Sequence, residues 1–364
     1  MDVIDLLIKF ISYPTITPKE EGLLDFIASY LDNFEPLFIQ KEGVKNLFLT
    51  KKFGEGEHLL FAGHIDVVPP GEGWNSDPFT PKIENGYIYG RGAQDMKSGV
   101  AAFVAAIKDI DTFNGRLSIL LTSDEEGEAK YGTKLVLEEL KKRSLLPDYA
   151  LVAEPTCEKR FGDAIKIGRR GSINGTLILN GKQGHVAYPS KAINPIELIA
   201  PILPKIAGVN LDNGDEFFEP SKFVITYLKS GMEVTNVTPQ TLKMMFNIRN
   251  STKTSLDDIR EFIHKYFDHL DFMLTLNQSA YPFLTDANSK IVKVLSKSIE
   301  EELSIVPKLS TAGGTSDARF FGQYNIPTVE FGVLNDTIHA PNERVGIDEV
   351  KKLYKIFKIF IKSF

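Results

Sequence analysis

The sequence predicts an α/β protein whose main domain holds a sheet covered by helices on both faces, with a smaller α+β domain inserted into it. In the first part of the chain, short apolar runs alternate with segments whose apolar residues recur at helical spacing. After Gly171, strands with an alternating pattern become more frequent, and the first type of pattern returns near Asp286. Two such changes along one chain indicate an insertion within the first domain.

The first part of the main domain is expected to span residues 1–171. Apolar residues at helical spacing predict helices at residues 3–11, 23–31, 97–110 and 133–142. Short apolar runs bounded by turn residues predict strands at residues 47–49, 59–62, 117–122 and 149–153. Strands that alternate with helices require crossover connections, so we expect a sheet buried between two helical layers.

The inserted domain is expected to span residues 172–284, and residues 285–364 are expected to complete the main domain. The order strand-helix-strand-strand-helix-strand, the split βαβ arrangement, is predicted for residues 172–180, 193–206, 222–229, 242–250, 256–267 and 271–276. The returning segment is expected to contain a helix at 291–303, a strand at 327–331 and a last helix at 349–360.

Composition limits the functions that the chain can have. The 364 residues include 42 Lys+Arg and 48 Asp+Glu, a net charge of −6, and we expect no nucleic-acid partner because no basic stretch interleaved with aromatic residues occurs. Cys157 is the only cysteine, which excludes an intrachain disulfide and a metal site built from several thiolates. Any metal ligands must therefore come mainly from the histidines and carboxylates.

We expect a cytoplasmic protein without a membrane partner. The N-terminal segment carries Asp2 and Asp5 before its apolar residues, which is unlike the basic start of a signal peptide. No apolar run approaches the about 18 residues of a membrane span. A single thiol is typical of a reducing compartment.

Candidate metal ligands follow the predicted strands, at the edge where α/β proteins bind ligands. His64 and Asp66 follow the strand at 59–62, four acids within residues 123–128 follow the next, and Glu154 follows a third. Each has a simpler interpretation, as a surface pair or a solvated loop. Together, however, N and O ligands with few thiols suit catalytic zinc, and a cation would offset the repulsion of adjacent acids.

Two further candidates lie outside these strand ends in sequence. Asp95 precedes the helix at 97–110, where it could equally cap the helix N-terminus, and His339 lies in the loop after the strand at 327–331.

The motifs GHIDVVPPGEGW, YGRGAQDMKSG, TSDEEGE, AEPT and HAPNE, in this order, resemble those of the M20 family of dinuclear zinc aminoacylases and carboxypeptidases. The resemblance covers nearly the whole chain. It implies a zinc-exopeptidase-like catalytic domain with a mixed sheet, and an inserted ferredoxin-like domain for dimerisation and as a lid. It also implies a homodimer and two Zn²⁺ per subunit, for which Co²⁺ could substitute.

The resemblance assigns the metal ligands individually. His64 and Glu154 would bind one zinc, Glu126 and His339 would bind the other, and Asp95 would bridge both.

The resemblance assigns three catalytic roles. Glu125 would be the general base, and Asp66 would orient His64. His185, in the inserted domain, would stabilise the oxyanion in the partner subunit's active site, whereas on its own it would be interpreted as a partly buried structural histidine.

The motifs IGRRGSINGTL, GKQGHVAYP, STAGGTSDARF and LNDTIH are most similar to family members that remove succinate from N-succinyl-LL-2,6-diaminopimelate. Arg169 and Ser172 match the succinyl-recognising pattern, and a guanidinium fork suits a carboxylate; the alternative is a surface basic pair. Further implied substrate-binding residues are Asn236 from the partner subunit, Gly314, Thr315 and Asn335.

Other functions stay open at this point. Ala340 and Pro341 differ from the Lys-Val frequent in those relatives, and family members with other substrates carry Ala-Pro there. An acetylornithine deacetylase or another N-acyl-amino-acid deacylase is therefore the enzyme alternative. The non-enzyme alternative is a metal-stabilised binding protein, which the presence of Glu125 disfavours.

Overall fold

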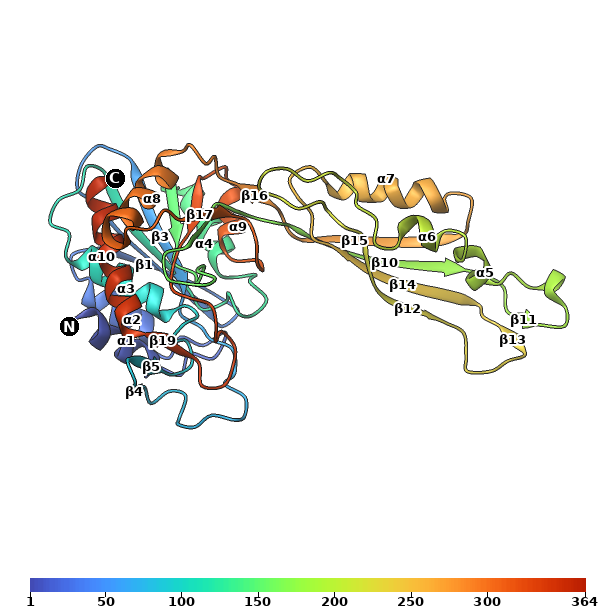
Figure 1. Ribbon diagram of the computed structural model, residues 1–364, viewed down its shortest axis with the longest axis horizontal. Coiled ribbons are helices and arrows are strands. Elements are labelled where there is room, and N and C mark those ends of the chain that lie inside the picture. Colours follow the sequence, from blue (N-terminus) through green and yellow to red (C-terminus); the bar gives the residue numbers. More distant parts are fainter. The chain divides into compact units, whose positions relative to one another are not determined.

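The computed structural model describes residues 1–364 and consists of two compact units (Figure 1). The first contains Met1–Gly168, Leu284–Ser310 and Ser316–Phe364, and the second contains Arg169–Phe283 and Thr311–Thr315. The residues at 169–171 and 311–315, which the sequence assigns to the main domain, pack with the second unit. The lid and dimerisation roles of that unit stay predictions. None of the helices combines the length and apolarity that a bilayer crossing requires.

The first unit is built on an eight-stranded mixed sheet. Across the sheet the strands are β1 (Glu35–Lys41), β2 (Val44–Lys52), β6 (Arg116–Thr122), β3 (His58–His64), β7 (Tyr149–Val152), β18 (Thr328–Glu330), β8 (Ala164–Lys166) and β17 (Lys308–Ser310). The central strands β6, β3, β7 and β18 run parallel, and β3 is buried over its whole length. This burial explains why β3 and β6 have continuous apolar runs instead of an alternating pattern.

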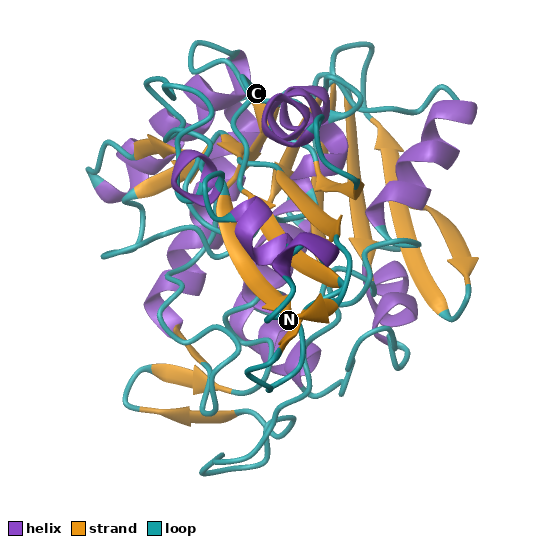
Figure 2. Ribbon diagram, turned by 90° about the vertical axis from the view of Figure 1, so that its right-hand side faces the viewer, coloured by secondary structure: helices purple, strands orange, loops and turns teal.

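Helices cover both faces of this sheet (Figure 2). On one face the Phe61 ring packs 5.7 Å from Phe103 of α3 (Lys97–Lys108) and 5.5 Å from Phe357 of α10 (Ile347–Ser363). His64 is three positions after Phe61 on β3, so its side chain and that of its partner Thr122 on β6 face the opposite side of the sheet. That side is covered by α4 (Thr133–Lys142). The remaining helices of this unit are α1 (Val3–Ile11), α2 (Leu23–Tyr30), α8 (Lys290–Leu303) and α9 (Ala318–Gly322). A small sheet consists of β19 (Arg344–Gly346), β5 (Tyr87–Tyr89) and β4 (Lys82–Glu84).

Helix α3 is central to the first unit, because it is buried from Lys97 to Ile107. Its approach to the end of β7 requires a glycine, since a Cβ atom at Gly99 would lie 2.2 Å from the carbonyl oxygen of Ala153. The close packing places the start of α3, and with it the preceding loop, at the edge where the parallel strands end.

The second unit has the predicted ferredoxin-like fold. Its antiparallel sheet has the order β12 (Val224–Ser230), β14 (Thr241–Ile248), β10 (Ser172–Asn180) and β15 (Phe272–Ala280). Helices α5 (Pro195–Ile199), α6 (Leu203–Ile206) and α7 (Leu256–Phe267) contribute Ile199, Ile206, Ile259, Ile263 and Phe267 to the core against this sheet. The fold class inferred from the sequence is thus confirmed.

The structure differs locally from the prediction. The single helix expected at 193–206 is divided into α5 and α6, because Pro201 and Pro204 lack the amide hydrogens that a continuous helix needs. Strand β1 was not predicted, since none of its residues is buried and its sequence has no apolar alternation.

His58 gives the fold a pH-dependent contribution to stability. Its side chain is 8% exposed and Nε2 lies 2.7 Å from Ser118 Oγ; burial, together with the charge of Arg116, lowers the pKa of His58 from 6.5 to about 4. The unfolded chain therefore binds this proton at a higher pH than the folded one does. The resulting stability is fully present above pH about 6.5 and is lost as the pH falls toward about 4, by at most about 3 kcal/mol.

We expect the free energy of unfolding to fall less between pH about 7 and about 5 in His58→Gln than in the unsubstituted protein. Urea titrations with a chelator present would measure this without a contribution from metal loss. The matched control is His269→Gln, at an exposed position, which should keep the original pH dependence. Equal pH dependence in all three proteins would contradict the assignment.

Candidate metal centre

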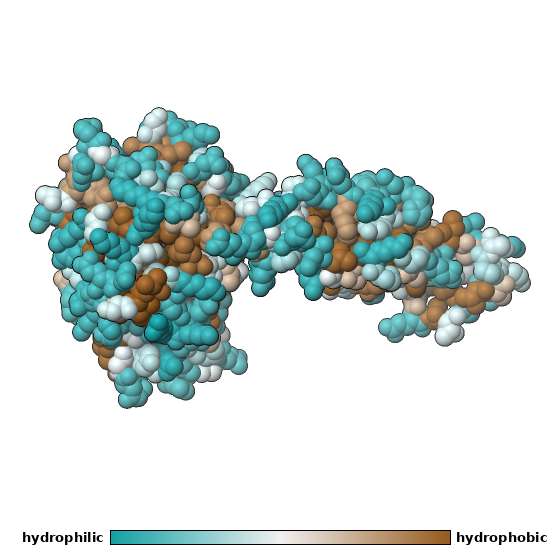
Figure 3. All heavy atoms as spheres, turned by 45° about the horizontal axis from the view of Figure 1, so that its top comes forward, coloured by the Kyte–Doolittle hydropathy of each residue, from teal (hydrophilic) through white to brown (hydrophobic).

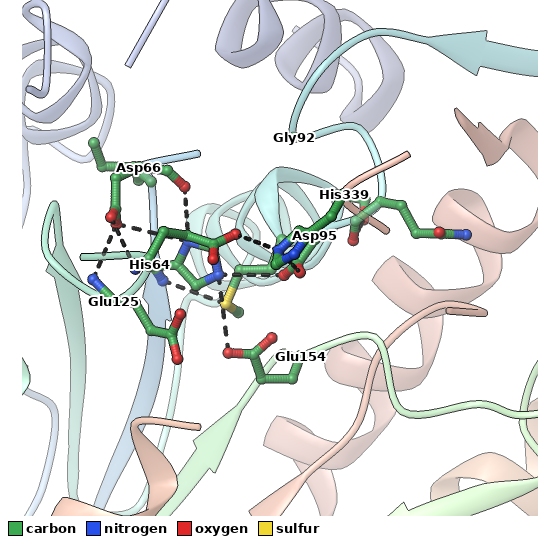
Figure 4. A network of polar contacts seen from close by, with 12 residues as sticks. His64, Asp66, Gly92, Asp95, Glu125, Glu154 and His339 are labelled. Carbon is green, nitrogen blue, oxygen red and sulfur yellow. Dashed lines mark hydrogen bonds and ion pairs between the residues drawn. The ribbon is translucent and has the colours of Figure 1, made fainter. Parts of the chain in front are cut away.

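Polar side chains from distant parts of the sequence meet where the parallel strands of the first unit end (Figure 4). His64 ends β3, Asp95 precedes α3, and Glu154 follows β7. Glu125 and Glu126 follow β6, the strand that pairs with β3. His339 comes from the loop after β18, so the structure brings together all five predicted metal ligands with the predicted base.

Asp95 lies between the two histidines. Its Oδ1 is 3.3 Å from His64 Nε2, and its Oδ2 is 3.4 Å from His339 Nε2. Glu154 Oε1 is 3.9 Å from His64 Nε2, and Glu126 Oε1 is 2.9 Å from His339 Nε2. Each imidazole therefore faces one separate glutamate and one oxygen of the shared aspartate.

The donor atoms suit a divalent cation. One ligand atom from each of His64, Asp95 and Glu126 lies within 4.8 Å of the others. Imidazole nitrogens and carboxylate oxygens are ligands that zinc accepts, and the cluster contains no thiol. The residues present thus fit the predicted metal.

The carboxyl groups of the cluster are held where negative charge is unfavourable. Burial, followed by the charges of neighbouring carboxylates, raises the pKa of Glu125 to about 8. Burial and the charge of Asp95 raise the pKa of Glu154 as well. A cation would favour the ionised forms of both groups.

The histidines supply positive charge to this cluster when they are protonated. Hydrogen bonds to Asp95 and Glu126 raise the pKa of His339 to about 10, and the pKa of buried His64 is also raised because Asp95 and nearby carboxylates outweigh its desolvation. Burial opposes ionisation of Asp95, but hydrogen bonds from both histidines hold its pKa well below the usual range. Since a metal ligand must be neutral imidazole, protons and a metal ion compete for these rings.

Asp66 orients His64 differently from the expectation. His64 Nδ1 donates to the backbone carbonyl oxygen of Asp66 at 2.8 Å, whereas the Asp66 carboxylate is 3.7 Å away. The carboxylate instead accepts from the backbone N–H groups of Glu126 at 3.1 Å and Glu125 at 3.4 Å. The imidazole is therefore fixed with Nε2 toward Asp95, and the Asp66 side chain holds the loop that carries Glu125 and Glu126.

The sequence reasoning missed two buried charged residues beside the cluster. Lys97 Nζ donates to the carbonyl oxygens of Phe10 at 3.0 Å and Tyr13 at 2.9 Å, and burial lowers its pKa to about 7. Glu343 accepts from three backbone N–H groups of the Asp95 loop. Both residues lie in motifs already singled out, Lys97 in YGRGAQDMKSG and Glu343 in HAPNE, so motif membership was a usable signal for each.

The second unit contains four of the predicted substrate-binding residues, Arg169, Ser172, Gly314 and Thr315. Arg169 is buried, and its Nη1 donates to the carbonyl oxygen of Ala312 at 3.0 Å, in the segment that contains Gly314 and Thr315. A Cβ atom at residue 313 would lie 2.4 Å from Arg169 Nη1, which only glycine avoids. Because Arg169 is itself buried, it does not belong to a surface basic pair; Ser172 is buried as well.

The other predicted substrate and catalytic residues are exposed. In the second unit, β11 (Gly184–His185) pairs with β13 (Val237–Thr238), and Val186 N donates to the carbonyl oxygen of Asn236 at 3.1 Å. His185 is exposed, with Nδ1 accepting from Ala187 N at 3.1 Å, which does not match a buried structural histidine. Asn335 lies exposed in the first unit, in the loop that leads to His339.

Known proteins resemble the chain along its whole length. Succinyl-diaminopimelate desuccinylase from Nitratiruptor sp. is 65% identical over 364 residues, 100% of both chains. The protein of the same name from Sulfurovum sp. is 63% identical and is covered to 99%, with 100% of this chain.

Solved structures share the fold at much lower sequence identity. Aminopeptidase PepT from Bacillus cereus has a TM-score of 0.81 at 19% identity, with 99% of this chain and 97% of that chain covered. The YxeP protein of Bacillus subtilis, described as a dinuclear metal-binding peptidase, has a TM-score of 0.70 at 14% identity, with 99% and 96% covered. A family model for peptidase family M20/M25/M40 matches residues 60–363, and the chain therefore belongs to this family.

Proposed function

We propose that this protein hydrolyses the amide bond of N-succinyl-LL-2,6-diaminopimelate, which yields succinate and LL-2,6-diaminopimelate. The observation that carries the proposal is the partly buried cluster of histidines and carboxylates with Glu125 beside it, in a chain that matches desuccinylases from end to end. The reaction serves lysine and peptidoglycan precursor synthesis, for which we expect a cytoplasmic enzyme.

Two divalent cations would be held by the cluster. The distances support His64 and Glu154 as ligands of one cation, Glu126 and His339 as ligands of the other, and Asp95 as the shared ligand. We propose Zn²⁺ at both positions, with Co²⁺ as a substitute. Such cations polarise a carbonyl oxygen and lower the pKa of water.

Glu125 is suited to move the proton in this reaction. It lies beside the proposed ligands (Figure 4), and its backbone N–H donates to the Asp66 carboxylate, so its loop is held in place. Its carboxylate would accept a proton from the attacking water and return it to the amine that leaves. Glu126 has its own contact with His339, so the two adjacent acids have separate roles.

Arg169 is the proposed partner of the succinyl carboxylate. A succinyl amide differs from an acetyl amide by this second carboxylate, which requires a cationic partner away from water. Arg169 is buried beside the segment Thr311–Thr315 and presents a planar donor fork. Ser172, Asn236, Gly314, Thr315 and Asn335 are proposed as further substrate contacts.

The substrate proposal predicts a clear preference among acyl groups. The zinc-loaded protein should hydrolyse succinyl-diaminopimelate much faster than N-acetylornithine. Arg169→Gln should raise KM for the succinyl substrate by about 10–100-fold, because one charge-assisted contact is lost, and should change acetyl turnover little. A preference for N-acetylornithine would favour the deacetylase alternative and exclude the proposed substrate.

Glu125→Gln tests whether the chain is an enzyme or a metal-stabilised binding protein. We expect kcat to fall by about 10²–10⁴-fold, because an amide cannot accept the proton. Metal analysis of the same preparation should still find about two ions per chain, since Glu125 is not a proposed ligand. Unchanged turnover would exclude the base role, and metal binding without turnover in the unsubstituted protein would favour the binding protein.

The chain is proposed to form a homodimer through its second unit. Strand β12 is at one edge of its sheet, and Val224, Tyr227 and Leu228 on it are 45%, 42% and 45% exposed. Apolar side chains are visible on the surface of this unit in Figure 3. An edge strand with exposed apolar residues is suited to pairing with a second copy.

A mixing experiment tests the proposed action of His185 across the dimer. His185→Ala and Glu125→Gln proteins should each be nearly inactive, but a mixture under subunit exchange should regain roughly a quarter of the normal activity. Half of the dimers are then hybrids, and each hybrid has one complete site. No recovery, with exchange verified by a mass-labelled subunit, would place His185 in the active site of its own chain.

A further inference from the structure

We infer that Glu343 is a positioning residue that holds two ligand-bearing loops of the metal centre in their binding arrangement before a metal arrives. The inference rests on the proposed metal function. It concerns the loop at 91–95, which presents Asp95, and the loop at 336–343, which presents His339.

Glu343 is fully buried and its two carboxylate oxygens are both occupied. Oε1 accepts from the backbone N–H of Gln94 at 2.8 Å and of Asp95 at 3.0 Å. Oε2 accepts from the backbone N–H of Gly92 at 3.0 Å and from Arg91 Nη1 at 2.8 Å. One side chain thus fixes the main chain of the Asp95 loop from Gly92 to Asp95 and the guanidinium of Arg91.

Further contacts tie the Asp95 loop to the His339 loop. The side chain of Gln94 donates to Asp336 Oδ1 at 2.7 Å and accepts from the backbone N–H of Thr337 at 2.7 Å. Arg91 Nη2 donates to the backbone carbonyl oxygen of His339 at 3.3 Å. The two loops therefore form one hydrogen-bonded assembly, and Asp95 and His339 extend from it toward each other, 3.4 Å apart.

Only a carboxylate fits the position of Glu343. All four groups that point at it are donors, so an amide in its place would direct its own N–H₂ group at an N–H donor. The buried Arg91 guanidinium would lose its counter-charge as well. Neither Glu343 nor Gln94 is a proposed metal ligand. Their effect on the metal centre is therefore exerted through Asp95 and His339.

Cobalt titration of the metal-free protein tests this inference without reference to turnover. We expect Glu343→Gln and Gln94→Ala to weaken Co²⁺ binding by about 10–100-fold, followed by the visible absorption of the ion. In the metal-free state, hydrogen exchange at the amides of Gly92, Gln94 and Asp95 should be faster in Glu343→Gln than in the unsubstituted protein. Gln94→Ala keeps the experiment decisive if Glu343→Gln does not fold.

The matched control is Asp212→Asn in the second unit. The Asp212 carboxylate likewise accepts from two backbone N–H groups, those of Gly214 at 2.7 Å and Ser221 at 3.2 Å. This variant should be less stable to heat but bind Co²⁺ normally, which separates a positioning effect from general destabilisation.

Normal Co²⁺ affinity in both Glu343→Gln and Gln94→Ala would overturn the inference. Absence of Co²⁺ binding in the unsubstituted protein would instead overturn the proposed metal function, so the two failures are distinguishable.

Discussion

The arrangement of the first unit depends on holding several carboxylates close together at a site where burial removes most of their hydration. Asp95, Glu125 and Glu154 share the edge at which β3, β6 and β7 end, and burial alone would favour their neutral forms. The main chain offsets part of this cost, since backbone N–H groups around the site donate to Asp66 and Glu343. Two histidines face the remaining charge, and the proposed cations would neutralise it when bound.

This constraint explains why the surrounding parts are packed so closely. Gly99 lets α3 approach the end of β7, which sets the height of the Asp95 loop above the sheet. Arg91 connects that loop to Glu343 and to the carbonyl oxygen of His339. The ligands are thereby supported from a helix, from strands and from a neighbouring loop, and a supported ligand loses little conformational freedom when it binds a metal.

The sequence predicted the parts of the molecule that have local signals. Buried parallel strands such as β3 appear as short apolar runs, and the candidate ligands directly follow them, so the strand-end site was predictable. The contact of His64 with the Asp66 carbonyl was not, because a backbone acceptor carries no residue signature. Glu343 was within a recognised motif, but its partners are residues 91–95, and one sequence gives no indication of such distant pairing. Strand β1 escaped prediction because none of its residues is fully buried and only Leu37 and Ile39, on one face, are half-buried.

The order of the chain has a consequence for how the metal centre can be assembled during synthesis. Glu126 and His339 are 213 positions apart, and Gly92 and Glu343 are 251 apart. The whole second unit is made between them, so a nascent chain that has just completed β7 contains His64, Asp95 and Glu126 but neither His339 nor Glu343. The acidic edge therefore stays without its last imidazole until the C-terminal segment joins the sheet, which makes full cation affinity a property of the finished polypeptide.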